Sequence, residues 1–407
     1  MPVSTPSFAK INLGLRIGAL RDNGFHELRT VYQTVALHDV IQVSMDSGSG
    51  IEIRCQDSRV PTDSTNTCWR IMERAMAALK ARGRVVVEID KRLPVQGGLG
   101  GASGNAVAAM LGLERAVGKK LSGSERLRIA AEVGSDLPLF LIGGTVLGVG
   151  HGEEVYPLQD LPATPCVIAL PEIAVSTLKA FADWDEQCGE EPALSERLKG
   201  ASRIGVLARE VTTGKGTTSS HAEIRQPSQS ALTAAGASGG SQHQVPRLRR
   251  SPDNGRSSSL GMTRDKNVSK LKNPELSDRM TEFSRELSAW LSAASEPSGR
   301  IAGVSSRAGG RAENLLLDLV RTGIENDFER VVFPQYPELR EVKRVLERAG
   351  ARYASLSGSG SAIYGLFGSR EKAAAAAKRL ERSGTRAVVT STLTRRQYWS
   401  RLLATSS

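Results

Sequence analysis

The stretch Leu93–Asn105 reads Leu-Pro-Val-Gln-Gly-Gly-Leu-Gly-Gly-Ala-Ser-Gly-Asn, and it lies between an apolar run that ends at Ile89 and an Ala-rich run with helical spacing that begins near Ala106. Four of the five residues from Gly97 to Gly101 are glycines, which permit positive φ angles and leave no side chain to keep an anion away. A glycine-rich turn that opens a helix directs unpaired N–H groups and the positive helix end at one spot. The stretch therefore predicts a phosphate-binding loop, and the alternative is a flexible surface turn.

Two well-known templates for such a loop do not fit this stretch. The P-loop requires a Lys-Ser or Lys-Thr pair after the glycines, and none follows here. The dinucleotide-binding fingerprint requires a third glycine at the position that Ser103 occupies. The loop is therefore of another kind.

Most of the net positive charge of the chain lies in one segment. The 407 residues carry 54 Lys and Arg against 43 Asp and Glu, and residues 201–280 alone hold 13 basic and 6 acidic side chains and no Phe, Tyr or Trp. Such a segment cannot bury enough apolar surface to offset its conformational entropy, so residues 200–273 are predicted to be a disordered basic insertion. A nucleic-acid-binding arm is the alternative, and a solvated insertion is favoured because its basic clusters lack interleaved aromatics.

Cysteine usage and hydropathy bear on the compartment. The four cysteines show no Cys-x-x-Cys spacing, which favours a reduced, cytoplasmic setting. No signal peptide is visible at the N-terminus. The longest apolar run, Leu137–Val149, is too short and too interrupted by glycine to span a bilayer. We therefore expect a cytoplasmic protein that does not cross a membrane.

Apolar spacing places the secondary structure in blocks rather than in strict βα alternation, which indicates an α+β fold. Strands are expected at 8–17, 26–36, 40–45, 51–55, 85–89, 143–149, 154–158, 167–170, 353–356, 362–367 and 386–390, the first two forming a hairpin. Helices are expected at 66–82, 106–117, 125–133, 177–184, 274–292, 311–322, 337–349 and 371–383.

Three further groups of residues could carry chemistry, and each has a plainer interpretation. Lys10 and Asn12 share one face of a strand, which is usually the solvent face. Asp136 precedes a short apolar turn, where an Asp is usually a helix N-cap. The small-residue turn Ser357–Ser361 joins two predicted strands; it is either a tight connection or a second loop that closes over phosphates.

Taken together and in this order, the motifs resemble the GHMP kinases, the family of galactokinase, homoserine kinase and mevalonate kinase. Within that family, they are similar to the signatures of members that phosphorylate a cytidyl-diphosphate sugar alcohol. The resemblance covers about residues 5–185 and 310–392. The motifs that carry it are Leu93–Ala106, Ala9–Leu13, Gly24–Leu28, Ser135–Pro138 and Leu356–Ser361, with Asn326–Glu329 and Tyr336–Leu339 also similar.

The resemblance implies the architecture. It predicts an N-terminal ribosomal-protein-like domain at residues 1–160, followed by a C-terminal ferredoxin-like domain. The second domain would comprise residues 161–199 and 274–395, with the basic insertion between its two parts.

The resemblance also implies the reaction and its participants. ATP with Mg²⁺ would supply the γ-phosphoryl group, and the acceptor would be the 2-hydroxyl of the methylerythritol part of a cytidine diphosphate sugar alcohol, in the non-mevalonate route to isoprenoid precursors. The partners are then small molecules, without a membrane and without nucleic acid as the main function, and the protein is a monomer or homodimer. The alternatives are a homoserine or mevalonate-type kinase, a nucleic-acid-binding protein and an inactive kinase homologue.

The resemblance assigns roles to individual residues. Asp136 would accept the proton of the acceptor hydroxyl, and Lys10 would keep that carboxylate ionised and offset charge during transfer. No residue is assigned as a metal ligand. The loop that would bind ATP, with its N–H groups on the phosphates, comprises Pro94, Val95, Gln96, Gly97, Gly98, Leu99, Gly100, Gly101, Ala102, Ser103 and Gly104, of which Pro94 alone has no N–H to donate.

The acceptor would be held by a second set of residues. His26 would hydrogen-bond the cytosine edge, while Phe25, Tyr32 and Phe181 would supply aromatic faces. Asn12 and Thr177 would lie near the polar end of the substrate. For Phe181 taken alone, core packing is an equally good interpretation.

Two positions depart from the pattern of the family. Gly104 stands where the family usually has a second Ser, so a hydroxyl that could touch phosphate or Mg²⁺ is missing, while Ser103 keeps the first. Phe25 replaces the commoner Tyr and keeps the stacking face. We expect function to survive both changes.

Overall fold

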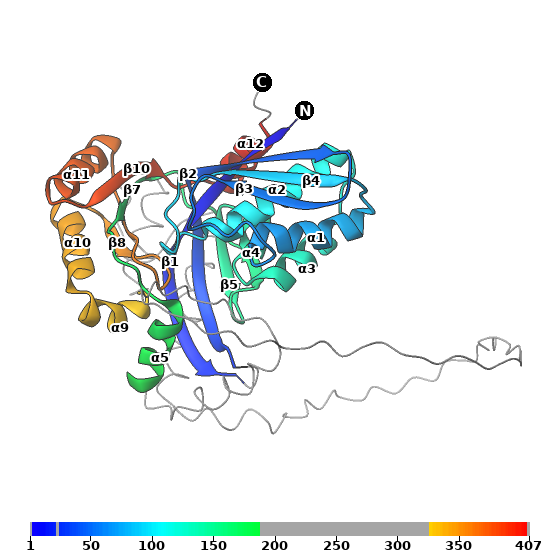
Figure 1. The fold of residues 1–407 in the computed structure, drawn as a ribbon. Helices are drawn as coiled ribbons and strands as arrows, with labels where there is room; N and C mark the ends of the chain where they lie inside the picture. Colours follow the sequence, from blue (N-terminus) through cyan, green and yellow to red (C-terminus); the bar gives the residue numbers. More distant parts are fainter. Residues whose placement is uncertain (1, 22–23, 188–324, 405–407) are drawn as a thin grey trace, which may run out of the picture. The chain divides into compact units, whose positions relative to one another are not determined.

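Two long strands, β1 (Val3–Leu20) and β2 (His26–Asp46), form the antiparallel hairpin that the sequence predicts (Figure 1). The computed structural model describes residues 2–21, 24–187 and 325–404, and all of these belong to one structural unit. The expected insertion at 200–273 and the expected helices at 274–292 and 311–322 lie outside the described residues.

The second strand is longer than the sequence suggests. The prediction of two strands, at 26–36 and 40–45, was wrong, because β2 continues through both. Pairing with β1 shifts register here: Phe8 lies opposite His38, whereas the next residue, Ala9, lies opposite Val35. The extra residues form a bulge that interrupts the alternation of side chains without ending the strand.

The first sheet contains six strands in the order β3-β4-β2-β5-β6, with β1 paired to the other side of β2. Its pairs are antiparallel except for β3 with β4. Figure 1 shows the four helices of this half beside the sheet. The remaining bounds are β3 (Gly50–Cys55), β4 (Arg84–Asp90), β5 (Thr145–Val149), β6 (Glu154–Pro157), α1 (Thr67–Leu79), α2 (Gly101–Val117), α3 (Gly123–Val133) and α4 (Leu137–Ile142).

The second sheet has four strands in the order β10-β7-β9-β8, all antiparallel. A shared apolar cluster, which includes Ile11 and Leu13 of β1 and Ile168 of β7, joins it to the first sheet. The bounds in this half are β7 (Pro165–Leu170), α5 (Thr177–Gln187), α9 (Phe328–Gln335), α10 (Pro337–Arg348), β8 (Tyr353–Leu356), β9 (Ile363–Leu366), α11 (Arg370–Arg382), β10 (Arg386–Ser391) and α12 (Arg395–Leu403).

The last helix, α12, packs on the first sheet although it follows the final strand of the second. Tyr398 of α12 is buried against Phe8 of β1, with ring centroids 5.4 Å apart, and donates a hydrogen bond to the Phe140 carbonyl at 2.6 Å. The helix was not predicted, although Thr394 and Gln397 form a capping box at its start, which is a sequence signal for a helix N-terminus.

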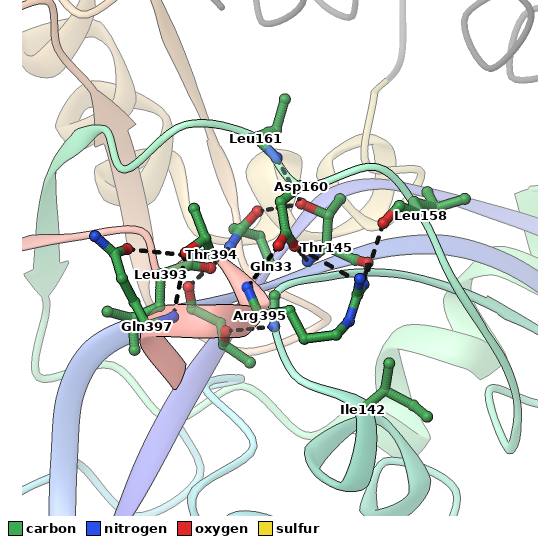
Figure 2. A network of polar contacts seen from close by, with 12 residues as sticks. Gln33, Ile142, Thr145, Leu158, Asp160, Leu161, Leu393, Thr394, Arg395 and Gln397 are labelled. Atoms are coloured by element: carbon green, nitrogen blue, oxygen red, sulfur yellow. Dashed lines mark hydrogen bonds and ion pairs between the residues drawn. The ribbon is translucent and has the colours of Figure 1, made fainter. Parts of the chain in front are cut away.

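A polar network anchors the start of α12 to the first half of the chain (Figure 2). The Arg395 backbone N–H donates to Asp160 Oδ2 at 2.7 Å, and its guanidinium donates to the carbonyls of Thr145 and Leu158. Thr145 in turn donates from Oγ1 to Gln33 Oε1 at 2.7 Å. Residues far apart in the sequence therefore share one set of buried and partly buried hydrogen bonds.

The α+β class is confirmed, and most predicted elements are present with shifted ends. Helix α2 begins at Gly101 rather than near residue 106, so the end of the glycine-rich stretch forms its first turn. Helix α9 was not predicted; it contains Pro334 within its span, which weakens the sequence signal for a helix.

Among the described residues, no helix combines the length and the apolar character that crossing a bilayer requires.

Candidate active site

Strand β1 carries Lys10 and Asn12 on the same face, as alternation predicts, but that face is not a solvent face. Lys10 is 4% exposed and Asn12 is 1% exposed. Lys10 Nζ donates to Asn12 Oδ1 at 2.7 Å, and Asn12 Nδ2 donates to Thr30 Oγ1 at 2.8 Å. A buried ammonium is costly unless it is paired and hydrogen-bonded, so this arrangement indicates a site rather than a surface.

Asp136 occupies the N-cap position of α4, but its side chain makes no capping hydrogen bond. Asp136 Oδ2 lies 3.6 Å from Lys10 Nζ, and Oδ1 accepts a hydrogen bond from the Tyr32 hydroxyl at 3.0 Å. The side chain is 33% exposed, so the carboxylate is paired and still reachable from solvent. The N-cap interpretation accounts for the position of Asp136 but not for where its carboxylate points.

The glycine-rich loop begins after β4 and ends in the first turn of α2. Gln96, Gly98 and Gly100 have φ angles of +62°, +74° and +68°, so two of the four clustered glycines take a conformation that L side chains rarely adopt. A Cβ on Gly100 would lie 2.9 Å from Lys10 Cγ. The Lys10 N–H also donates to the Leu99 carbonyl at 2.9 Å. The loop therefore lies directly against the strand that bears the Lys10 ammonium.

The same loop lines a pocket of about 340 Å³. Every residue from Pro94 to Ser103 lines it, together with residues of α1 and the loop that precedes it. One wall contains Cys68, whose thiol pKa is raised by burial to about 12, so the group stays a neutral thiol. The pocket thus combines the loop amides with a partly apolar hollow, and neither Lys10 nor Asp136 is among its lining residues.

The second small-residue loop, Ser357–Ser361, packs against the first. Ser357 Oγ donates to the Gly98 carbonyl at 3.0 Å, and the Ala362 N–H donates to the Gly97 carbonyl at 3.2 Å. A Cβ on Gly358 would lie 3.5 Å from Lys10 Nζ. The structure therefore brings both glycine loops and the Lys10 side chain together from three distant parts of the chain.

The buried Asn326 holds this second loop in place. Its Nδ2 donates to the carbonyls of Leu356 and Gly358, at 2.9 and 2.7 Å, while its Oδ1 accepts from the Phe328 N–H at 3.1 Å. Nearby, Glu329 Oε1 accepts from the Leu356 N–H at 2.9 Å. The Asn326–Glu329 motif is therefore used, at these two positions, to fix backbone around the site.

The residues expected at the nucleobase fall into separate neighbourhoods. His26 is buried, with Nδ1 3.0 Å from the Gly18 carbonyl and Nε2 3.1 Å from Asp185 Oδ1. Its ring stacks on Phe181 at 5.1 Å with an interplanar angle of 5°. Tyr32 is buried beside Lys10, with the ammonium 5.5 Å from the ring centroid. His26 and Phe181 thus lie together near Asp185, whereas Tyr32 lies beside Lys10.

Phe25 and Thr177 complete the expected set. Phe25 is 56% exposed, and its ring lies 5.0 Å from that of His151, whose Nδ1 is 2.7 Å from Ser135 Oγ. Phe25 therefore contacts, through His151, the residue Ser135 that precedes Asp136 in the chain. Thr177 Oγ1 lies 2.8 Å from Ser359 Oγ in the second loop.

Gly104 faces β1 and not the pocket. A Cβ at this position would lie 2.9 Å from Ser7 Oγ and 3.0 Å from the Phe8 carbonyl oxygen. The close approach of α2 to β1 therefore accounts for a glycine at a position where the family pattern has Ser. Ser103, by contrast, is among the residues that line the pocket.

Sequence reasoning missed Thr30, Asn326 as a holder of the second loop, and the pair of Ser135 and His151. Asn326 and Ser135 carried a signal, because each belongs to a motif that the resemblance covered, whereas His151 did not. Thr30 is one Thr in an ordinary strand, and nothing local distinguishes it.

Comparisons with known proteins identify the family of the chain. Residues 66–144 match the family model "GHMP kinases N terminal domain", and residues 311–386 match "GHMP kinases C terminal". The chain is 31% identical to the 4-diphosphocytidyl-2-C-methyl-D-erythritol kinase of Solibacter usitatus (strain Ellin6076) over 364 residues, which are 89% of this chain and 81% of that protein. It is 39% identical to the protein of the same name from Rhodococcus jostii (strain RHA1) over 45% of this chain and 60% of that protein.

Solved structures show the same fold. A crystal structure of 4-(cytidine 5'-diphospho)-2C-methyl-D-erythritol kinase superposes with a TM-score of 0.57 at 22% identity, covering 96% of this chain and 98% of that one. The homoserine kinase of Cytophaga hutchinsonii superposes equally well, with a TM-score of 0.57 at 16% identity over 97% of this chain and 95% of that one. At these identities the superpositions show the fold alone.

Proposed function

The chain belongs to the 4-diphosphocytidyl-2-C-methyl-D-erythritol kinase family of GHMP kinases, and on that premise we propose that Lys10 and Asp136 carry out its reaction. The reaction is the ATP-dependent phosphorylation of the 2-hydroxyl of 4-diphosphocytidyl-2-C-methyl-D-erythritol, a step of the non-mevalonate route to isoprenoid precursors. The observation that carries the proposal is the buried Lys10 ammonium 3.6 Å from the Asp136 carboxylate, directly beside the glycine-rich loop.

The two side chains suit phosphoryl transfer. Such transfer requires positioning and neutralisation of charge more than covalent chemistry. Asp136 would accept the proton as the hydroxyl oxygen attacks the γ-phosphorus, and the Lys10 ammonium would stabilise the negative charge that develops on the transferred group. Because Asp136 is partly exposed while Lys10 is buried, the acceptor hydroxyl would approach from the Asp136 side.

The pocket beside Pro94–Ser103 would hold ATP. Loop amides and the N-terminus of α2 attract phosphate, and the partly apolar hollow is suited to the adenine. Among the described residues, no group of three or more His, Cys, Asp or Glu side chains is arranged to hold a metal ion. Mg²⁺, which keeps several waters and binds mainly to substrate phosphates, would therefore enter with ATP.

The acceptor would be recognised near Phe25, His26 and Phe181. His26 and Phe181 stack on each other here, so cytosine would use the outer face of one ring or require Phe181 to turn aside. Thr177 and Asn12 offer polar groups between this region and the Lys10 ammonium. We further propose that the protein acts in the cytoplasm, as a monomer or homodimer; the free thiols of Cys55, Cys68 and Cys166 accord with a reduced compartment.

The test is an ADP-release assay with Mg-ATP and, in turn, 4-diphosphocytidyl-2-C-methyl-D-erythritol, homoserine and mevalonate as acceptors. We expect turnover with the cytidyl substrate alone, and a fall in kcat of about a hundredfold or more for Asp136→Asn. Asp46→Asn, a surface change at the far end of β2, is the matched control and should retain full activity. Equal activity of Asp136→Asn and wild type would refute the role of the carboxylate, and turnover of homoserine or mevalonate would redirect the assignment within the GHMP kinases.

A further inference from the structure

A relay of hydrogen bonds runs behind the Lys10 ammonium, from β1 to β2 and back. Thr30 Oγ1 lies 2.8 Å from the Gly14 carbonyl oxygen and 2.8 Å from Asn12 Nδ2, and Asn12 Oδ1 lies 2.7 Å from Lys10 Nζ. The side chains of Lys10, Asn12 and Thr30 are all buried. Water therefore does not compete for these groups, and each relies on its neighbour in the relay for a hydrogen-bond partner.

The chemistry of the groups fixes the direction of every bond in the relay. The Gly14 carbonyl can only accept, so the Thr30 hydroxyl donates its single proton there and must accept from Asn12. The amide nitrogen of Asn12 then faces Thr30, and its oxygen faces the Lys10 ammonium, which can only donate. Both ends require the same orientation of the amide, so this orientation does not depend on how nitrogen and oxygen are assigned.

The same strand also orients the carboxylate. Thr30 and Tyr32 are two residues apart on β2 and therefore share a face. Tyr32 holds Asp136 Oδ1, and Thr30 holds Lys10 through Asn12. Between these two arms, Lys10 Nζ and Asp136 Oδ2 remain 3.6 Å apart, which is longer than a direct N–H···O hydrogen bond.

We propose that Thr30 is a positioning residue of the phosphoryl transfer, a role that rests on the proposed function. Through Asn12 it keeps the Lys10 ammonium from closing onto the Asp136 carboxylate. The ammonium then stays directed at the phosphoryl group. The carboxylate keeps an oxygen lone pair available to accept the proton of the acceptor hydroxyl. Without the relay, the Lys10 ammonium would form a direct hydrogen bond with the Asp136 carboxylate. Neither group would then be free to contact the substrates.

The test replaces Thr30 with Val, which has nearly the same shape but neither donates nor accepts. For Thr30→Val we expect kcat to fall about tenfold, the loss that corresponds to one well-oriented hydrogen bond, while KM for Mg-ATP changes by less than about twofold. Thr30→Ser, which keeps the hydroxyl, should restore most of the lost activity.

The matched control is Thr145→Val. Thr145 is also fully buried and also donates one hydrogen bond and accepts one, to Gln33 Oε1 and from the Leu161 N–H, in the network away from Lys10 (Figure 2). Both Val variants should lower the melting temperature by similar amounts, but Thr145→Val should keep the wild-type kcat. Equal losses of kcat in the two variants, or none in Thr30→Val, would overturn the proposal.

Crystal structures of the wild type and Thr30→Val test the relay without turnover. We expect Lys10 Nζ to leave Asn12 Oδ1 and to approach Asp136 within hydrogen-bond distance in the variant. A Lys10 side chain that still contacts Asn12 in Thr30→Val would refute the relay, even if the wild type proved to phosphorylate a different acceptor. Failure of the wild type to phosphorylate any acceptor, with the expected movement of Lys10, would count against the proposed function alone.

Discussion

At the residue scale, the protonation state of Tyr32 is set by its surroundings. Burial, and next to it the Asp136 carboxylate that accepts its hydrogen bond, raise the Tyr32 pKa well above the ordinary value of 10. The phenol is therefore neutral at physiological pH and can only donate toward the carboxylate. A donor whose direction does not change suits a group that holds a general base in place.

For Tyr32→Phe we expect kcat to fall by about tenfold, because the Asp136 carboxylate loses one of its two partners and no longer keeps a single orientation. The measurement is steady-state kinetics with both substrates. Tyr398→Phe removes another buried hydroxyl, which donates to the Phe140 carbonyl away from the site, and it should cost stability without lowering kcat. A Tyr32→Phe enzyme as fast as the wild type would contradict this role of the phenol.

At the element scale, the two glycine loops depend on each other's lack of side chains. A Cβ on Gly98 would overlap the Ser357 carbonyl oxygen, and a Cβ on Gly360 would overlap the Gly98 nitrogen. Their backbones are therefore packed more closely than any other residue type allows. Each loop alone resembles an ordinary turn, and the requirement for glycine becomes clear only where they meet.

Gly98→Ala should consequently raise KM for Mg-ATP by about tenfold or more and lower the melting temperature, since the loops must separate. Gly118→Ala is the matched control: Gly118 has a similar φ of +71° at the end of α2, but nothing lies within 4 Å of its Cβ position. It should show the cost of the backbone strain without the change in KM. Isothermal titration with a non-hydrolysable ATP analogue would measure the same difference, and equal affinities for the two variants would contradict it.

At the scale of the whole molecule, Tyr32, Tyr364 and Tyr398 are buried and Tyr353 is partly buried, and the loss of hydration is the largest cause that raises the pKa of each. In the unfolded chain these phenols ionise near pH 10, whereas the folded protein retains their protons. Above pH 10 the folded state thus binds more protons than the unfolded state, so the free energy of unfolding falls as pH rises. Below pH 10 the two states bind these protons equally.

We therefore expect the tyrosine contribution to stability to be complete below about pH 10 and to be lost progressively above it. Urea unfolding at a series of alkaline pH values would measure the loss. Tyrosinate absorbance should rise in a second, cooperative step that coincides with the loss of circular dichroism. Ionisation of all tyrosines in a single step while the fold persists would contradict the expectation.

Helix α12 shows how far the tertiary structure departs from the order of the chain. The sequence indicates that residues up to 395 complete the second domain, yet the helix that follows buries Tyr398 and Leu402 in the cluster of the first sheet. A capping box marks where that helix begins, but no local pattern states which sheet it will cover. The hydrogen bonds between Arg395 and Asp160 (Figure 2) hold the start of the helix against the first half of the chain.

The sequence by itself determined what depends on short-range pattern: the glycine-rich loop between a strand and a helix, the hairpin of β1 and β2, the α+β class and, through motifs in a fixed order, the family. Only the tertiary structure decided what depends on register and packing: that Asp136 turns its carboxylate to Lys10 instead of capping α4, that Ser357 lies on Gly98, and that Thr30 stands behind Asn12. The physical reason is range. Alternation and backbone freedom act within a few residues, whereas hydrogen bonds between distant strands exist only after a bulge, a register and a close approach of backbones have placed their ends together.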